Sequence, residues 1–410
     1  MTNKVTAMKP FIVCCILCAL PMTARATDRY YFDIHVQSPS GHYQVDATSP
    51  DNQGPNGKAF QANFTYKCVD TRTGKTIWTR KQPMREPQRF NFGDSSFEIA
   101  VPKEGSPRII IVSNLGAAAI LAANDHLITI SPQGQKTGEI DLVKDALQKE
   151  ESERLMYHSW GGSNWSRLAA WYFFELPEGE IFVIRPAWGP RILLDVNKGK
   201  LVSGDVSLIG PALQAEKQLV LSASRNKIEL EDHEWSLLQA AYLAGSLNLH
   251  EAIPFLKSLE MSKYSETNSA RGHPDGVNFN NEVDPFRYRT YDLRQTAQLS
   301  LRRLGVAPRN LPCHGFMIER GDEAFPFTPK KQTQPRHKNA VQVKTGMSAK
   351  EVLNTIGAPD YINDDSWSYD MDAEVPFSLT LTFDTYNVTA IKKEAPRWKT
   401  GLARDKALAF

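Results

Sequence analysis

Residues able to carry out catalysis occur in this chain, but they do not stand at the spacings of known catalytic motifs. Cys313 precedes His314 in a proline-bounded stretch, and His250-Glu251 has no second histidine at helical spacing. No His-Glu-x-x-His, phosphate-loop or dinucleotide-glycine motif is present in the sequence, and no Cys-x-x-Cys motif occurs outside the apolar run 11–20. We therefore predict a protein that is not an enzyme and that uses no metal or cofactor. A hydrolase is an alternative, because catalytic triads are geometric; it would show a cleft with a perturbed histidine or carboxylate.

A glycine-rich aromatic loop is the candidate site for binding a ligand without catalysis. Residues 158–165 read His-Ser-Trp-Gly-Gly-Ser-Asn-Trp, which brings Trp160 and Trp165 close together in the chain. Exposed tryptophans beside small polar residues can stack on sugars or peptides. The other interpretation is a tight turn whose tryptophans fill the core. Ser163 does not form a nucleophile elbow, because the second glycine of that motif is missing.

Charged residues gather at three places, and a solvated surface explains each of them. The basic run 336–338 could touch phosphates or anionic lipid, and three arginines of a predicted helix could receive an acidic partner. These arginines are Arg294, Arg302 and Arg303. A group of carboxylates could bind calcium, and its members are Asp364, Asp365, Asp370 and Asp372. The formal net charge is +2 with both signs interspersed, which argues against a nucleic-acid surface.

The first 26 residues have the order of a secretory signal peptide. Lys4 and Lys9 precede the apolar run Phe11–Leu20, which is too short to span a membrane, and a small-x-small site ends at Ala26. We expect cleavage after Ala26 and export to the periplasm or the extracellular space. The segment contains three cysteines, but none of them follows a small residue at the end of the apolar run, so a lipid anchor is the less favoured alternative.

Residues 27–228 are predicted to form a β-rich domain, with one charged helix at about 141–156. Alternating or continuous apolar residues predict strands at 30–36, 42–45, 60–68, 76–79, 108–113, 117–122, 126–131, 182–184 and 191–195. The phrase D-x-x-T-G-K-x-x-W at Asp70–Trp78 resembles a blade motif of quinoprotein-type β-propellers, and Ser38–Gly41 resembles a turn of other propellers. Regular repeats are missing, so we expect a β-sandwich or a partial propeller-like sheet.

From residue 229 the apolar period becomes helical. Residues 229–305 predict three helices, around 235–245, at 250–260 and at 287–304, with a polar loop at 262–285. The third helix ends in A-x-x-x-L-x-x-L-G-x-x-P, which resembles the end of a HEAT-like repeat. Residues 306–340 are rich in proline, lysine and glutamine and predict an extended linker.

A short helix with both ends marked follows the predicted linker. Met347 and Ser348 precede Glu351 and Val352, so the stretch has a capping box and the positions for a hydrophobic staple. Gly357 is expected to take the left-handed position after the helix.

Three strands are predicted after this helix, and Pro359 separates them from it. They are 366–371, 377–383 and 388–391. A helix and a three-stranded meander that cover each other make a complete α+β module.

This module resembles the SmpA/OmlA (BamE-like) domain. The resemblance lies in the pattern G-M-S-x-x-E-V-x-x-x-I-G-x-P and in the following Trp-x-Tyr strand, and its residues are Gly346, Met347, Ser348, Glu351, Val352, Gly357, Pro359, Trp367 and Tyr369. It covers residues 341–395 and implies an envelope module, with outer-membrane assembly as the family's setting. The chain departs from the family in its single clear helix, its long N-terminal extension and the absence of a lipid anchor. Residues 396–410 are expected to be a frayed tail.

Together these features predict a multidomain α+β protein of the cell envelope. We expect a secreted, non-enzymatic protein–protein interaction or assembly accessory module with an envelope protein as partner; peripheral membrane association stays open, and no nucleic acid is involved. The alternative is a glycan- or peptidoglycan-binding protein that uses Trp160 and Trp165. Once the signal is removed, Cys68 and Cys313 are the remaining cysteines. They are expected to be separate thiols, with a disulfide as the alternative.

Overall fold

The computed structural model describes thirteen stretches of the chain: residues 33–49, 64–83, 88–92, 95–99, 107–122, 125–149, 169–186, 191–225, 230–269, 283–309, 311–320, 323–363 and 365–400. They divide into two compact units, which we call unit 1 (1–186 and 191–206) and unit 2 (187–190 and 207–410). The described residues are β-rich with several helices, so the protein is a multidomain α+β protein. No helix among these stretches is both long and apolar enough to cross a bilayer. The predicted signal peptide and the Trp160/Trp165 loop lie outside the described residues.

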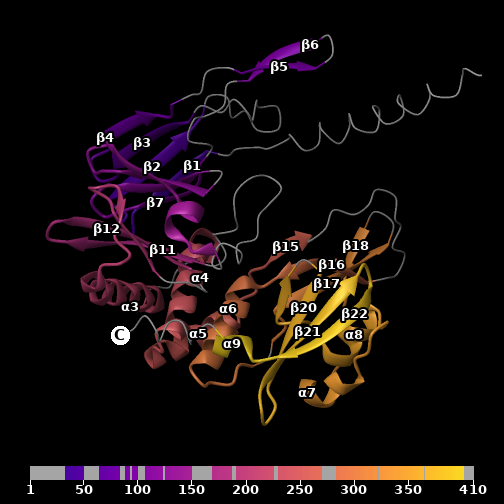
Figure 1. The fold of residues 1–410 in the computed structure, drawn as a ribbon. Helices are drawn as coiled ribbons and strands as arrows, with labels where there is room; N and C mark the ends of the chain where they lie inside the picture. Colours follow the sequence, from indigo (N-terminus) through magenta and orange to yellow (C-terminus); the bar gives the residue numbers. More distant parts are fainter. Residues whose placement is uncertain are drawn as a thin grey trace, which may run out of the picture. The chain divides into compact units, whose positions relative to one another are not determined.

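The described part of unit 1 contains three four-stranded antiparallel sheets, each with its strands in sequence order (Figure 1). The first sheet consists of β1 (Ile34–Gln37), β2 (Tyr43–Thr48), β3 (Thr65–Asp70) and β4 (Thr76–Lys81). The second consists of β7 (Pro107–Val112), β8 (Ala118–Ala122), β9 (His126–Ile130) and β10 (Lys136–Asp141). The third consists of β11 (Ala169–Leu176), β12 (Gly179–Pro186), β13 (Ile192–Asp195) and β14 (Lys200–Leu201). A separate hairpin joins β5 (Gln88–Phe92) to β6 (Ser95–Ile99).

The first two sheets share one apolar core, and their first strands β1 and β7 contact each other. Trp78, the last residue of the blade-like phrase, lies in this core and donates its indole N–H to the Gly116 carbonyl at 3.0 Å. Gly134 has φ of +80°, and a Cβ there would lie 2.4 Å from Trp78. The turn of the phrase is closed by Asp70, whose carboxylate accepts the backbone N–H groups of Arg72 and Thr73. The predicted hairpin loop is confirmed.

The predicted helix at 141–156 differs from the observed chain. A five-residue π-helical turn, η4 (Leu142–Ala146), follows β10, and the description stops at residue 149. The β-rich region is also shorter than 27–228, because α3 (Ile209–Arg225) is a helix of unit 2. Its apolar positions follow helical spacing, with Ala212, Val220 and Ala223 buried.

The three predicted helices of unit 2 are present as α4 (Leu230–Ser246), the short turn η7 (His250–Ala252) with α5 (Ile253–Glu260), and α6 (Asp292–Arg303). Helices α4 and α6 approach closely at Gly245, where a Cβ would lie 2.6 Å from the Ser300 hydroxyl. That hydroxyl donates to the Ala241 carbonyl at 2.7 Å. The third helix begins later than the predicted residue 287, because 283–290 is a strand in which buried Tyr288 and Thr290 flank exposed Arg289.

Residues 306–340 are not the extended linker that their composition suggested. They contain β17 (His314–Arg320), β18 (Glu323–Pro326), α7 (Arg336–Asn339) and η8 (Ala340–Gln342). With β15 (Glu266–Ser269) and β16 (Val283–Thr290), strands β17 and β18 form a four-stranded antiparallel sheet, so part of the predicted polar loop at 262–285 is also strand. The prolines and lysines of 326–336 suggested a linker, but the residues before them form β17, in which Phe316 is buried.

The C-terminal module has the predicted helix and strands, with one strand more. Helix α8 (Ala349–Ile356) begins with a capping box in which Glu351 accepts the Ser348 N–H at 2.7 Å. Gly357 has φ 79° and ψ −167°, so it has the expected positive φ but not the left-handed helical conformation. Strands β20 (Ser366–Met371), β21 (Phe377–Asp384) and β22 (Asn387–Glu394) form the meander, and β19 (Tyr361–Asn363) adds a fourth strand at its edge.

The sheet β15–β18, helix α8 and the sheet β19–β22 share a single hydrophobic core. Phe316 of β17 stacks against Trp367 with ring centroids 4.6 Å apart, and Trp367 stacks against Phe383 at 4.4 Å. Residues 341–395 therefore share their core with the preceding strands. The predicted tail is also partly structured, since α9 (Arg397–Thr400) contacts α6 and Trp398 is buried.

Candidate functional site

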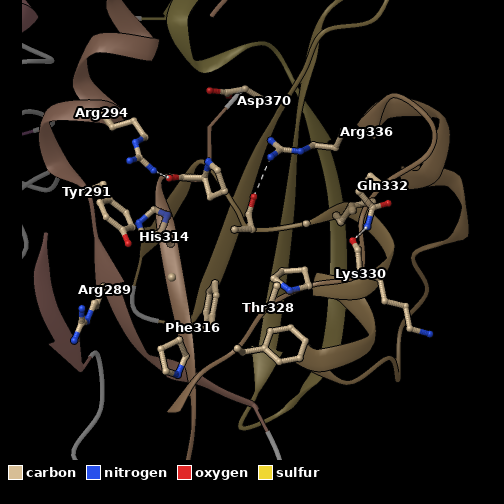
Figure 2. A pocket seen from close by; sticks show the side chains of 18 of the residues that line it. Arg289, Tyr291, Arg294, His314, Phe316, Thr328, Lys330, Gln332, Arg336 and Asp370 are labelled. Carbon is tan, nitrogen blue, oxygen red and sulfur yellow. Dashed lines mark hydrogen bonds between the residues drawn. The ribbon is translucent and has the colours of Figure 1, made fainter. Parts of the chain in front are cut away.

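A cavity of about 630 Å³ opens in unit 2, bordered by β16, β17, the start of α6, the segment 326–337 and the end of α8 (Figure 2). This volume is in the range of small-ligand sites. Aromatic and aliphatic side chains form much of the wall, namely Tyr291, Phe316, Met317, Phe327 and Ile356. Polar and charged side chains complete it, namely Arg289, Arg294, His314, Thr328, Lys330, Gln332, Arg336, His337, Asp370 and Asp372.

One side of the cavity is basic. Arg289 is exposed near the end of β16, and Arg294 lies in the first turn of α6 with its guanidinium 4.3 Å from the Tyr291 ring. Arg294 donates to the carbonyls of Pro312 and Ser262, which hold the side chain in position but do not neutralise its charge. Figure 2 shows Arg289, Tyr291, Arg294 and His314 on one side, and Lys330, Gln332 and Arg336 on the other.

Arg336 on the opposite side is fixed by a buried carboxylate. Its guanidinium pairs with Asp360 and donates to the Ala358 carbonyl at 3.0 Å. The same Asp360 carboxylate accepts the backbone N–H of Asp370 at 2.7 Å. Arg336 is thus the structural ion-pair partner of Asp360, just before β19, and its charge is matched within the fold.

The segment before Arg336 is attached to helix α8. The side chain of Asn354 accepts the backbone N–H of Lys330 at 3.0 Å, and Gln332 donates to the Asn354 carbonyl at 2.8 Å. Gln332 also accepts from Asn339 at 2.7 Å. These bonds satisfy a carbonyl of the last helical turn and hold the rim of the cavity in place.

The arginines and aspartates that appeared as separate surface clusters in the sequence pair with each other. Buried Arg302 donates to Asp372 at 2.9 Å, and Arg397 donates to buried Asp370 at 3.1 Å. Burial alone would raise the pKa of Asp370, but the charge of Arg397 and its hydrogen bond outweigh burial and lower that pKa. The solvated-surface interpretation is wrong for Arg302 and Asp370, which are buried, whereas Asp372 is paired but exposed. The described residues contain no group of three or more metal-ligating side chains, and Asp364 lies outside them.

His314 is buried in the cavity wall and neutral at physiological pH. Burial lowers its pKa to about 4, and its Nδ1 lies 3.0 Å from the Pro359 carbonyl. Because a carbonyl can only accept, Nδ1 donates, and Nε2 is left as an acceptor. The preceding Cys313 donates to Gln298 at 3.5 Å, away from this contact, and burial raises its pKa. The two neighbours therefore do not form a nucleophile–base pair.

One feature of the hydrolase alternative is present, since a histidine of shifted pKa lines a cavity. No serine, threonine or cysteine side chain within the described residues is hydrogen-bonded to His314. The arrangement can accept a hydrogen bond from a ligand, but it supplies no activated nucleophile.

The residues of the predicted module have mostly structural roles. Trp367 and Tyr369 are buried, and Ser348 and Glu351 cap α8. Gly357 lines the cavity, so the end of this motif reaches the site. Sequence reasoning missed Arg289, Tyr291, Gln332 and Arg336 as lining residues. The alternation Phe-Arg-Tyr-Arg-Thr at 286–290 could have indicated the strand that carries Arg289.

Cys68 and Cys313, the two cysteines among the described residues, are free and buried, one in each unit. Burial raises the pKa of Cys68 to about 11. The prediction of separate thiols agrees with this, and both are chemically unreactive at neutral pH.

Unit 1 contains a buried carboxyl group that binds a turn of the neighbouring sheet. Glu180 of β12 accepts from the Ser113 hydroxyl at 3.0 Å, and its other oxygen, Oε1, has no hydrogen-bond partner among the residues that the structure describes. Ser113 in turn accepts the N–H groups of Leu115 and Ala117, which close the β7–β8 turn. Burial raises the pKa of Glu180 to about 7.

We expect Glu180→Gln to remove a pH dependence of unit 1. The folded carboxyl binds its proton up to pH about 7 and the unfolded one only to about 4.5, so wild-type stability falls as pH rises between these values. The loss from pH 5 to pH 8 should be about 2 kcal/mol in the wild type and close to zero in the variant. Hydrogen exchange of peptides from β12 at pH 5 and at pH 8 measures this loss of stability. Glu178→Gln, in the exposed neighbouring turn, is the control and should behave like wild type; an equal pH response in Glu180→Gln would contradict the expectation.

Comparisons with known proteins leave the family open. No family model matches the chain, and no curated protein matches it. Among solved structures, "Crystal structure of HIRA(644-1017)" is similar over 58% of this chain and 83% of that chain, with 10% sequence identity and a TM-score of 0.20. A TM-score this low does not assign a fold, so the function has to be argued from the site.

Proposed function

We propose that this chain is an exported cell-envelope protein that binds a partner protein, and that the unit 2 cavity is the binding site. The observation that carries the proposal is an excess of positive charge beside an apolar wall. Arg289, Arg294 and Lys330 line the cavity, and none of them has a carboxylate within 4 Å among the described residues. Unmatched cations beside aromatic side chains are typical of a surface that receives a ligand.

The absence of catalysis is part of the proposal and has its own support. The lining aspartates, Asp370 and Asp372, already pair with Arg397 and Arg302, which do not line the cavity. Arg397 lowers the pKa of Asp370, and both carboxylates already have a cationic partner, so neither is placed as a general acid. With His314 bonded to a carbonyl, the site favours recognition over acid–base chemistry.

The envelope setting rests on the sequence. Residues 1–26 have the order of a cleavable signal, and residues 341–395 resemble the SmpA/OmlA domain in their capped helix and strand pattern. We further infer that unit 1 is a partial propeller rather than a sandwich. Its support is that the first strands of successive sheets contact each other, β1 with β7 and β7 with β11, as the strands nearest the axis do in stacked blades.

Filling the cavity should abolish partner capture. Gly315 lies opposite Arg289 in the β16–β17 ladder, and a Cβ there would stand 3.8 Å from the Tyr291 ring, an ordinary contact. Gly315→Leu therefore places a side chain in the cavity without backbone strain. We expect the tagged full chain, recovered from the periplasmic fraction and cut after Ala26, to co-purify with an envelope protein that Gly315→Leu loses at least tenfold.

Gly210→Leu is the matched control, because a Cβ at this exposed position at the start of α3 meets nothing within 4 Å. Its capture should equal that of the wild type. Capture that survives in Gly315→Leu, with the variant still folded by circular dichroism, would overturn the proposal. Point variants are preferable to deleting 341–395, since that deletion removes the core partners of Val283, Tyr288 and Phe316.

A further inference from the structure

We propose that the cavity recognises an acidic peptide segment, with a carboxylate at Arg289 and an adjacent apolar side chain against Phe316. This inference rests on the proposed function, because it names the chemistry of the partner that the same site takes. It depends on three observations: the unmatched charge, the unused hydrogen-bonding groups on the same side, and the nature of the opposite wall.

Four Arg or Lys side chains line the cavity, and in the described part of the chain only Arg336 has a carboxylate partner, Asp360. The two lining aspartates are each held by an arginine from outside the cavity. The site therefore carries a net positive charge in a partly apolar setting, where the field is stronger than in bulk water. An anion is the complementary ligand.

The basic side has room for that anion. Arg289 is exposed and stands opposite Gly315, which has no side chain to cover it. The neighbouring Tyr291 hydroxyl has no hydrogen-bond partner among the described residues. Arginine binds carboxylates in a two-pronged geometry, and a tyrosine hydroxyl beside it supplies one more donor.

A peptide fits better than a bare anion because of His314. Its ring is neutral, and Nε2 is an acceptor, so it repels a carboxylate but binds an N–H group. A peptide presents N–H groups next to its carboxylates, whereas phosphate and fatty acids do not. Figure 2 shows His314 on the same side of the cavity as Arg289 and Tyr291, so this side carries both donors and an acceptor.

The rest of the wall is suited to an apolar side chain. Phe316, Phe327 and Ile356 line the cavity together with Pro326 and Pro329. The prolines have no backbone N–H, so this part of the rim offers a peptide contact area rather than donors. An acidic residue next to an aromatic one matches both halves of the site.

The test is a calorimetric titration of the full chain with three blocked peptides. The probes are acetyl-Asp-Phe-Asp-amide, its neutral counterpart acetyl-Asn-Phe-Asn-amide, and acetyl-Asp-Ala-Asp-amide, with inorganic phosphate as a competitor. We expect the first to bind at least tenfold more tightly than either of the others, more weakly as salt is raised, and without displacement by equimolar phosphate.

Two charge variants localise the effect. Arg289→Met should weaken the acidic aromatic peptide about tenfold and leave the neutral one unchanged. Lys338→Met removes the same charge from an exposed residue that does not line the cavity, and it should bind like wild type.

The outcomes separate this inference from the proposed function. Equal binding of the acidic and neutral peptides, or an Arg289→Met variant that binds normally, overturns the acidic-peptide inference. So does the absence of any peptide binding or full displacement by phosphate. In each of these cases, loss of partner capture by Gly315→Leu still supports the proposed function. Unchanged capture by Gly315→Leu overturns both.

Discussion

Replacing Trp367 with alanine is expected to lower the free energy of unfolding of unit 2 by about 4 kcal/mol. The indole is 1% exposed and stacks between Phe316 of one sheet and Phe383 of the other. Truncation removes the transfer free energy of the ring and leaves a cavity at the junction of the two sheets. Neighbours on rigid strands relax only partly into such a cavity, so the loss should be near the upper end for a core substitution.

Urea denaturation followed by far-ultraviolet circular dichroism measures this loss without relying on the fluorescence of the removed indole. Trp367→Phe keeps an aromatic ring in the stack and should lose less than half as much. Val375→Ala is the surface control, because Val375 is exposed, and it should change stability by less than 0.5 kcal/mol. A Trp367→Ala loss below about 1 kcal/mol would show that the two sheets do not depend on a common core.

Asp370→Asn is expected to destabilise unit 2 by about 3 kcal/mol at pH 7. The carboxylate is buried, accepts from the Ser378 hydroxyl at 3.0 Å and pairs with Arg397. Asparagine has nearly the same shape but no charge, so the partly buried guanidinium loses its counter-ion. Asp384→Asn removes the same charge from the exposed β21–β22 turn and should be close to neutral.

The sign of the pH dependence follows from the lowered pKa of Asp370. A carboxyl group whose folded pKa lies below its unfolded value of about 3.9 adds stability above that value and loses it as pH falls through the folded pKa. The gap between wild type and Asp370→Asn should thus be full at pH 7 and shrink below pH about 4. Urea titrations at the two pH values test this, and a gap that widens in acid would mean that Arg397 is not the cause.

Local signals in the sequence predicted local structure well. The capping box at Ser348 and the alternation of β20 and β21 depend on neighbours within a few residues, and both are present in the structure. The polar hairpin loop after Asp70 was predictable for the same reason, since its hydrogen bonds span two and three residues.

The parts that sequence reasoning missed depend on partners far away in the chain. Arg302 and Asp372 are 70 residues apart in the chain. The sequence around each predicts a solvated charge, and only the fold shows that the two form an ion pair. Arg336 stands in a basic, proline-flanked run, and only the position of Asp360 explains its burial. The cavity is made by elements that the sequence had divided among a helix, a linker and a separate domain, so no local pattern could have revealed it.

The pairing of α9 with the rest of unit 2 has a consequence for the order in which the protein matures. Arg397 supplies the counter-ion of Asp370, and Trp398 lies 5.4 Å from the Arg302 guanidinium. Until residue 398 has left the ribosome, a nascent chain holds a buried aspartate with an unmatched charge, and unit 2 cannot reach its final packing. Unit 1 does not need residues near the C-terminus for its packing, since its sheets and core end by residue 206. Unit 2 therefore completes its packing only after α9 has been synthesised, whereas unit 1 can fold while unit 2 is still being made.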